Sequence, residues 1–229
     1  TPVSGTIAEV TTWALADSPF QVTGNVTVAS GVTLTIEPGV TVKFDSGKAL
    51  DINGTLIARG TSTSTITFTS SSLSPAAGDW KFIRLNSSAS SATFDGSGNY
   101  LTGSIFQYCK VEYAGAGAYP SMVPAIYAIS VSPFIDHCTI QHNGSLGLYV
   151  SASPAGGTIR ITNNLFNDNL GGGMTLGANA DSSIIIENNT VTNSGGGNGI
   201  KFSGGGYGGA VTVTASVSNN FVSGNLGKG

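Results

Sequence analysis

The sequence predicts an all-β chain wound into a single β-solenoid of roughly eight coils. Three observations favour this fold class. The chain contains 33 glycines among its 229 residues, and only 9% of residues are charged although 40% are hydrophobic. Short stretches alternate between apolar and polar residues, with Gly, Asn or Asp at roughly every 8–12 positions. A unit of about 26 residues repeats in the second half, which is the period that a solenoid coil of three short strands requires.

Composition also narrows the classes of function. The net charge of −3 gives no basic footprint, so nucleic acid is not an expected partner. No run approaches 18 consecutive apolar residues, so we expect no membrane span. The first residues lack the basic and apolar regions of a signal peptide. Five Asn-x-Ser/Thr sequons permit glycosylation of a secreted protein, at Asn25, Asn53, Asn86, Asn143 and Asn188.

Two parts of the chain are distinguished. Residues 1–24 form an N-terminal cap or extension, in which TTWALADSPF is compatible with one helical turn, and residues 25–229 form the solenoid domain. The alternating pattern of the first half predicts strands at Val26–Val28, Leu34–Ile36, Val40–Phe44, Leu50–Ile52, Leu56–Ala58, Ile66–Phe68 and Lys81–Leu85.

The repeat is clearest after residue 104. Aligned coils have equivalent centres separated by 29, 26, 25 and 31 residues, namely Cys109, Cys138, Asn164, Asn189 and Asn220. Because stacked coils lie about 4.8 Å apart, these residues are expected to form a structural ladder inside one turn. The same spacing is compatible with a disulfide between Cys109 and Cys138, or with two reduced thiols that replace ladder asparagines.

The segments LTIEPGVTVKF, NGTLIARGTSTSTITFTS and GDWKFIRL, together with coils of the form I-x-x-N-x-φ-x-x-N, resemble one known class. It comprises bacterial and archaeal surface proteins of the right-handed parallel β-helix repeat type, which share their fold with pectate lyases and polygalacturonases. The resemblance implies a right-handed parallel β-helix over nearly the whole chain. It is a poor guide to function, because this fold carries enzymes, adhesins and structural stalks.

The stretch FIDHCTIQHNG concentrates reactive side chains, but strand alternation is expected to separate them. Asp136 belongs to a polar column with Gln107, Thr162 and Glu187 that we expect to face solvent. Alternation directs Asp136, His137 and His142 to different sides, and two exposed histidines without supporting groups rarely bind a metal. We expect neither a metal site nor a cofactor.

Catalysis is not favoured by the pattern of carboxylates. No column places two acids on adjacent coils, as a calcium-dependent lyase needs. Arg160 matches the basic end of the polygalacturonase motifs, but the paired aspartates and the Gly-His-Gly of those enzymes have no counterpart. Asp136 and Asp168 lie on adjacent coils in different columns, so their separation is left to the structure. No catalytic residue is assigned.

Two insertions are candidate ligand-binding regions. AGAGAYPSMVPAIY must leave the solenoid as a loop, and it carries Tyr119, Met122 and Tyr127; GGGYGGAVTV adds Tyr207. Insertions in repeat proteins often map to the binding face, and aromatic rings stack on sugars. The alternative is that these side chains cover the edge of a coil.

The last residues, NNFVSGNLGKG, stop part-way through a coil. Either the chain is a fragment of a longer surface protein, or another subunit covers the end; residues 1–12 could add to a neighbour's open coil. The sequence therefore predicts a non-catalytic extracellular module of structural or adhesive type, with end-to-end self-association and glycans as candidate partners. The alternative is a polysaccharide-binding or polysaccharide-degrading protein.

Overall fold

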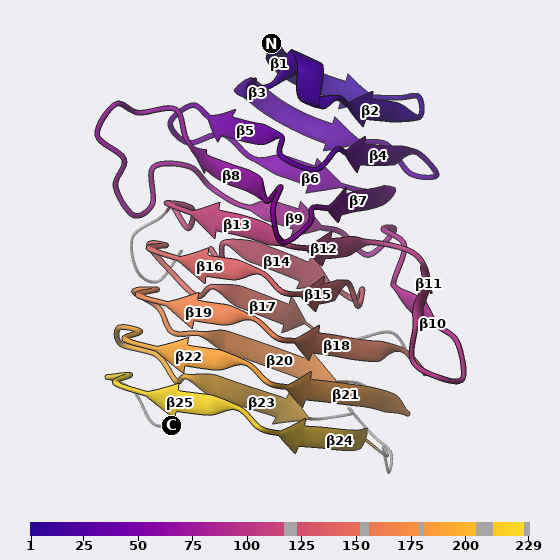
Figure 1. The fold of residues 1–229 in the computed structure, drawn as a ribbon, viewed down its shortest axis with the longest axis vertical. Helices are drawn as coiled ribbons and strands as arrows, with labels where there is room; N and C mark the ends of the chain where they lie inside the picture. Colours follow the sequence, from indigo (N-terminus) through magenta and orange to yellow (C-terminus); the bar gives the residue numbers. More distant parts are fainter. Residues whose placement is uncertain (117–122, 152–155, 179–180, 205–212, 227–229) are drawn as a thin grey trace.

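The structure, a computed structural model, describes residues 1–116, 123–151, 156–178, 181–204 and 213–226. In them the chain winds into a parallel β-helix whose three faces run along one axis, with the N-terminal tiers at the top of Figure 1. The first face is an eight-stranded sheet whose order follows the sequence. Its strands are β2 (Thr11–Trp13), β4 (Thr33–Ile36), β7 (Thr55–Arg59), β12 (Ile105–Gln107), β15 (Phe134–Asp136), β18 (Thr158–Thr162), β21 (Ser182–Glu187) and β24 (Val213–Ser218).

The second and third faces belong to one 15-stranded sheet, because the long strand β3 (Phe20–Val28) joins them at the N-terminal end. The second face contains β5 (Thr41–Phe44), β8 (Ile66–Ser70), β13 (Cys109–Glu112), β16 (Thr139–Gln141), β19 (Leu165–Asn167), β22 (Thr190–Thr192) and β25 (Phe221–Ser223). The third face contains β6 (Leu50–Ile52), β9 (Ile83–Leu85), β14 (Ile126–Ile129), β17 (Leu148–Ser151), β20 (Met174–Ala178) and β23 (Ile200–Gly204).

All seven strands expected in the first half are present, with ends that differ by a few residues. The N-terminal segment also takes part in the sheets. β1 (Pro2–Ile7) pairs with β3 and β2 pairs with β4, with the short 3-10 helix η1 (Leu15–Asp17) between β2 and β3. Because β3 runs through residue 24, the backbone passes from this segment into the first coil without a break.

The core lies inside the solenoid, where every second residue of a strand points. In β8 the residues alternate between buried and half-buried positions, as the period of two in a strand requires. Phe44 stacks on Trp80 with ring centroids 3.9 Å apart, and the Trp80 Nε1–H donates to the Glu112 carbonyl over 2.9 Å. Aromatic rings thus pack between tiers, and the one polar atom of the buried indole has a partner.

From β12 onward the turn between the first and second faces is short because one residue in each of five coils adopts a left-handed conformation. These residues have φ between 48° and 59°: Tyr108, His137, Asn163, Asn188 and Asn219. Asparagine tolerates this region better than most residues, and the three regular coils use it. The steps between these residues equal those of the ladder positions, so each coil turns at an equivalent point.

Candidate functional site

A β-hairpin leaves the solenoid between the third and first faces. It comprises β10 (Thr93–Phe94) and β11 (Tyr100–Thr102), and the Ser104 N–H closes its base by donating to the Ser90 carbonyl over 2.9 Å. At its tip Asp95 accepts hydrogen bonds from the backbone N–H groups of Ser97 and Asn99. Figure 1 shows the hairpin beside the first face. The sequence analysis missed it, although DGSGN between two aromatic residues is a turn signal.

The hairpin covers an apolar patch on the outside of the first face. Ile105 and Phe134 belong to a small core outside the solenoid, separate from the main core, against which Phe94 and Tyr100 pack. The Phe94 and Tyr100 rings lie 5.3 and 6.2 Å from the ring of Phe134. The hairpin is therefore held by its own hydrophobic contacts.

Arg160 of β18 fixes the tip of the hairpin. Its Nη1 donates to the Gly98 carbonyl over 2.7 Å, and its guanidinium lies 5.5 Å from the ring centre of Phe94 and 5.9 Å from that of Phe134. The approach is so close that a Cβ on Gly98, where φ is +83°, would meet Nη1 at 2.6 Å. A glycine is therefore required at this point of the tip.

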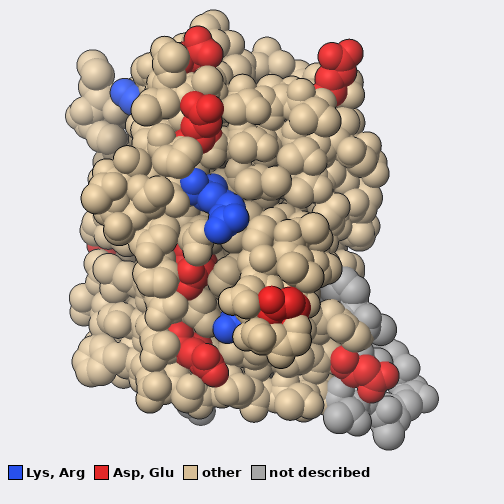
Figure 2. All heavy atoms as spheres, turned by 45° about the vertical axis from the view of Figure 1, so that its right-hand side comes forward, with Lys and Arg blue, Asp and Glu red and all other residues tan. Residues whose placement is uncertain are grey.

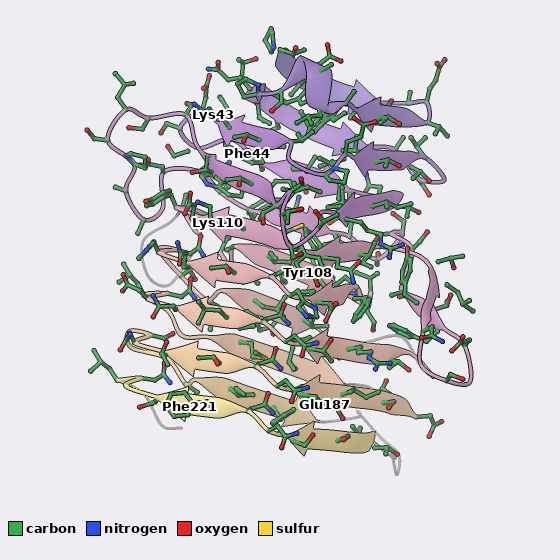
Figure 3. All side chains as sticks on the ribbon, in the orientation of Figure 1. Lys43, Phe44, Tyr108, Lys110, Glu187 and Phe221 are labelled. Atoms are coloured by element: carbon green, nitrogen blue, oxygen red, sulfur yellow. The ribbon has the colours of Figure 1, made fainter. Side chains whose placement is uncertain are left out.

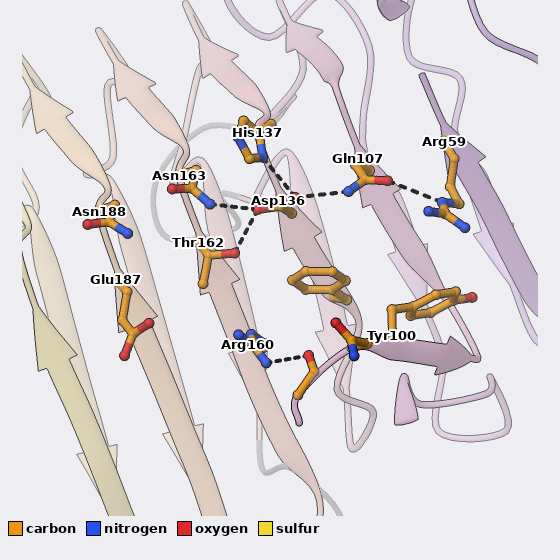
Figure 4. Close-up of a pocket in the computed structure, with 13 residues that line it drawn as sticks. Arg59, Tyr100, Gln107, Asp136, His137, Arg160, Thr162, Asn163, Glu187 and Asn188 are labelled. Carbon is orange, nitrogen blue, oxygen red and sulfur yellow. Dashed lines mark hydrogen bonds and ion pairs between the residues drawn. The ribbon is translucent and has the colours of Figure 1, made fainter. Parts of the chain in front are cut away.

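An open hollow of about 480 Å³ lies between the hairpin and the ends of five successive strands of the first face, and we name it the hairpin groove (Figure 4). This volume is within the range of small-molecule sites. Its lining residues are Arg59, Gly98, Asn99, Tyr100, Gln107, Phe134, Asp136, His137, Arg160, Thr162, Asn163, Glu187 and Asn188.

Asp136 forms the floor of the hairpin groove and is only 6% exposed. Its Oδ1 accepts hydrogen bonds from Thr162 Oγ1 (2.7 Å) and Asn163 Nδ2 (2.9 Å), and its Oδ2 accepts from Gln107 Nε2 (2.9 Å). His137 Nδ1 lies 2.8 Å from the same Oδ2. Burial alone would raise the pKa of Asp136, but these four hydrogen bonds outweigh it and hold the pKa below the ordinary value of 3.8.

Four hydrogen bonds occupy the lone-pair directions of this carboxylate. Asp136 is consequently ill suited to take a proton, attack a substrate or bind a metal, and instead links its own coil to both neighbours. Two expectations are corrected here. Asp136 does not face solvent, because Thr162 and the turn side chains enclose it. Asp136 and His137 do not diverge, because the left-handed turn at His137 brings the imidazole back over the carboxylate.

The polar floor continues across the coils to Arg59 at the end of β7. Arg59 Nε donates to Gln107 Oε1 over 3.1 Å, and its guanidinium lies 5.4 Å from the ring centre of Tyr100. At the other end Glu187 Oε1 accepts from Ser216 Oγ over 3.1 Å. Tyr108 and Glu187 lie on the same side of the solenoid in Figure 3, several tiers apart. The floor thus runs along the axis, across successive coils.

The residues expected to form a ladder lie inside the same turn. The Asn164 Nδ2 donates to Asn189 Oδ1 over 2.9 Å, and the Asn189 Nδ2 donates to Asn220 Oδ1 over 3.0 Å. Cys109 and Cys138 are buried free thiols on neighbouring coils. Burial, with the adjacent Cys138 thiol, raises the pKa of the Cys109 thiol well above its ordinary value of 9.0.

A second ladder, in the turn between the second and third faces, was missed. Asn143 Nδ2 donates to Asn169 Oδ1 over 2.8 Å, and Asn143 Oδ1 accepts from the Ala114 N–H. Further along, Asn225 Oδ1 accepts from the Ser194 N–H over 2.9 Å. The signal was present, because these five residues are separated by the same 29, 26, 25 and 31 residues.

Of the four residues predicted to bind a ligand, only Tyr127 lies within the described residues; Tyr119, Met122 and Tyr207 lie outside them. Tyr127 is not in a loop, which corrects the expectation. It belongs to β14, where it lies half-buried on the third face with its ring 5.4 Å from that of Tyr149. The inserted stretch re-enters the sheet earlier than expected, because Ile126 already pairs with Ile83 of β9.

His142 and Asp168 are likewise not isolated. Their Nδ1 and Oδ2 atoms are 2.8 Å apart across adjacent coils, in the turn that holds the second ladder, whereas Asp136 lies in the other turn. The two aspartates therefore each pair with a histidine in separate turns. Within the described ranges, no group of three or more His, Cys, Asp and Glu side chains could hold a metal ion. No helix in these ranges is long and apolar enough to span a bilayer.

Known proteins were compared with the chain. It is 47% identical over 57 residues to protein bark beetle of Drosophila melanogaster, a match that covers 25% of this chain and 2% of that protein. The chain thus corresponds to a very small part of that relative. No solved structure matches significantly. The model of the family described as "Right handed beta helix region" matches residues 24–226, and the chain belongs to this right-handed β-helix family.

Proposed function

We propose that this β-helix is a non-catalytic extracellular binding module that holds a glycan in the hairpin groove. The observation that carries the proposal is the combination of an open hollow of about 480 Å³ with a carboxylate floor that is already fully hydrogen bonded. Because the lone pairs of Asp136 are occupied, this carboxylate cannot serve as an acid, base or nucleophile, which favours binding over bond cleavage.

The chemistry of the wall favours a sugar. Exposed amide side chains of Asn99, Asn163 and Asn188 line the groove, and amides both donate to and accept from hydroxyl groups. Tyr100 and Phe134 supply apolar ring surface beside them. Sites for small organic ligands combine apolar surface with a few placed polar groups in this way.

The experiment is a glycan-array screen followed by calorimetry on two matched variants. Asn188→Gly removes a groove amide, and Asn219→Gly removes the equivalent amide one coil further along, which does not line the groove. Glycine is compatible with the left-handed φ at both positions, so neither change strains the turn. We expect about a tenfold loss of affinity for Asn188→Gly only. Equal affinities for both variants would contradict the proposal.

A second candidate function is end-to-end association, which one observation supports. On the last described tier Val217, Phe221 and Leu226 are 50%, 60% and 85% exposed (Figure 3 labels Phe221), although such residues are usually covered. A second copy stacked on β24 and β25 would cover them. Light scattering and electron microscopy over a concentration series test this: filaments support it, and a monomer at all concentrations contradicts it. The extracellular location is tested by surface labelling of intact cells.

A further inference from the structure

The three arginines of the chain are placed unequally. Arg84 forms an ion pair with Asp51, with Nε and Oδ1 2.6 Å apart, on the third face. Arg59 and Arg160 both line the hairpin groove, and within the described residues neither lies within salt-bridge distance of a carboxylate. Two guanidinium groups without an acidic partner therefore face the same hollow. Figure 2 shows few charged side chains on this side of the molecule, with acidic patches next to the basic ones.

Both guanidinium groups are held in place by neutral acceptors. Arg59 Nε donates to the amide oxygen of Gln107, and Arg160 Nη1 donates to the backbone carbonyl of Gly98. The rings of Tyr100 and Phe94 lie beside them and restrict their movement. A guanidinium carries five N–H donors, so most donors of each group have no hydrogen-bond partner in the described part of the chain. Its planar fork matches carboxylate and sulfate oxygens.

Neither acidic residue of the groove, Asp136 or Glu187, forms a salt bridge with Arg59 or Arg160, although Glu187 lies on the strand next to that of Arg160. The hydrogen-bond capacity of Asp136 is filled by its four neighbours. Glu187 lies on β21, four strand spacings from Arg59 on β7, which is about 19 Å along the axis. At that separation a surface charge is largely screened at physiological salt. Figure 4 shows Arg59 and Glu187 at opposite ends of the groove.

We propose that the hairpin groove selects an acidic glycan, and that Arg59 and Arg160 bind carboxylate or sulfate groups on its sugars. The inference rests on the proposed function and names its ligand class. Arg59 and Arg160 stand three strand spacings apart, about 14 Å along the axis, so they contact different acidic groups of one extended chain. Glu187 at the far end opposes a further acidic group.

The test is calorimetric titration with three oligosaccharide probes of equal length, namely hyaluronan (carboxylate), dextran sulfate (sulfate) and neutral dextran. The wild-type chain is expected to bind at least one acidic probe about tenfold tighter than the neutral one, and this preference should shrink as salt rises. The carboxylate and sulfate probes tell the two acidic groups apart.

Four variants test the expected direction of each effect. Arg59→Gln should lower affinity for the acidic probe about tenfold, and Glu187→Gln should raise it about two- to fivefold. Lys43→Gln removes the same charge from an exposed position on the second face and should change nothing. Arg160→Lys, which keeps the charge but loses the planar fork, should weaken acidic binding without loss of the fold.

The outcomes separate the two proposals. If the neutral probe binds as tightly as the acidic ones, glycan binding stands and the acidic selectivity is wrong. If Lys43→Gln weakens binding as much as Arg59→Gln, the attraction is that of net charge and the selectivity is again wrong. If none of the probes binds but the array finds another neutral glycan, this inference alone fails. If no glycan binds at all, both proposals fail.

Discussion

Two rows of polar side chains follow the turn between the first and second faces. They differ in whether their hydrogen-bond donors all have partners. In the inner row, the Nδ2 of Asn164 donates to Asn189 and to the Ile135 carbonyl, and its Oδ1 accepts the Cys138 N–H. In the outer row, two positions earlier in each coil, hydrogen bonds also link neighbouring coils, but Arg59 at its end keeps free donors. The same repeat thus builds a closed scaffold when it points inward and the floor of an open groove where a hairpin stands over it.

The largest effect should come from the inner row. Asn164→Ala leaves the Cys138 N–H and the Ile135 carbonyl without their partners in a buried turn. We expect the free energy of unfolding to fall by about 3 kcal/mol, since each unsatisfied buried group costs about 1–3 kcal/mol. Urea denaturation measures this, with the exposed Asn188→Gly as control, for which less than about 0.5 kcal/mol is expected. Similar losses for both would show that the inner row is no scaffold.

The second effect concerns the floor of the groove. Asp136→Asn places an amide where four donors converge, and we expect a loss of about 2 kcal/mol at neutral pH. Because the pKa of Asp136 is lowered in the folded chain, its contribution to stability is present above the ordinary value of 3.8 and is lost as pH falls below it. Unfolding curves between pH 2 and 6 should therefore converge for the two proteins at low pH. A constant difference across that range would contradict this account.

A smaller, local effect is expected in the hairpin. Gly98→Ala brings a Cβ within 2.6 Å of Arg160 Nη1 at a positive φ, at a cost of about 1–2 kcal/mol. The hairpin tip should exchange its amide hydrogens faster while β15 and β18 keep their protection. Hydrogen exchange followed by mass spectrometry measures the hairpin tip and the two strands separately. Faster exchange throughout the first face would mean that the hairpin is part of the scaffold.

The smallest effect should come from a substitution that adds one more asparagine to the inner row. Cys138 Sγ donates to the Phe106 carbonyl over 3.4 Å, as ladder asparagines do to the carbonyl of the preceding coil. Cys138→Asn should therefore change the free energy of unfolding by less than about 1 kcal/mol, whereas Cys138→Leu, which cannot donate, should cost more. The melting temperatures of Cys138→Asn and Cys138→Leu measure this order. If Cys138→Leu were the more stable variant, apolar packing and not hydrogen bonding would determine stability at this position.

The sequence predicted the scaffold well because a coil is a local unit that repeats. The centres at Asn164, Asn189 and Asn220 mark equivalent turns, and alternation marks the strands between them. The candidate site was not predicted, because it depends on features that occur once. The hairpin has no counterpart in other coils, and Arg160 meets Gly98, 62 residues away, only after folding. The burial of Asp136 was also missed, because alternation gives the direction of a side chain but not its enclosure by Thr162 and the side chains of the turn.

The central claim is that the hairpin completes the binding site over the polar side chains of the coils, which do not bind without it. Since Ser90 and Ser104 are hydrogen bonded to each other, residues 91–103 can be replaced by two glycines without opening a coil. We would titrate this variant and the wild-type chain with the array's best glycan, and compare their thermal melting. The account predicts that binding is lost while the solenoid still melts cooperatively. Undiminished affinity in the folded variant would contradict it and direct attention to the tyrosines of the third face.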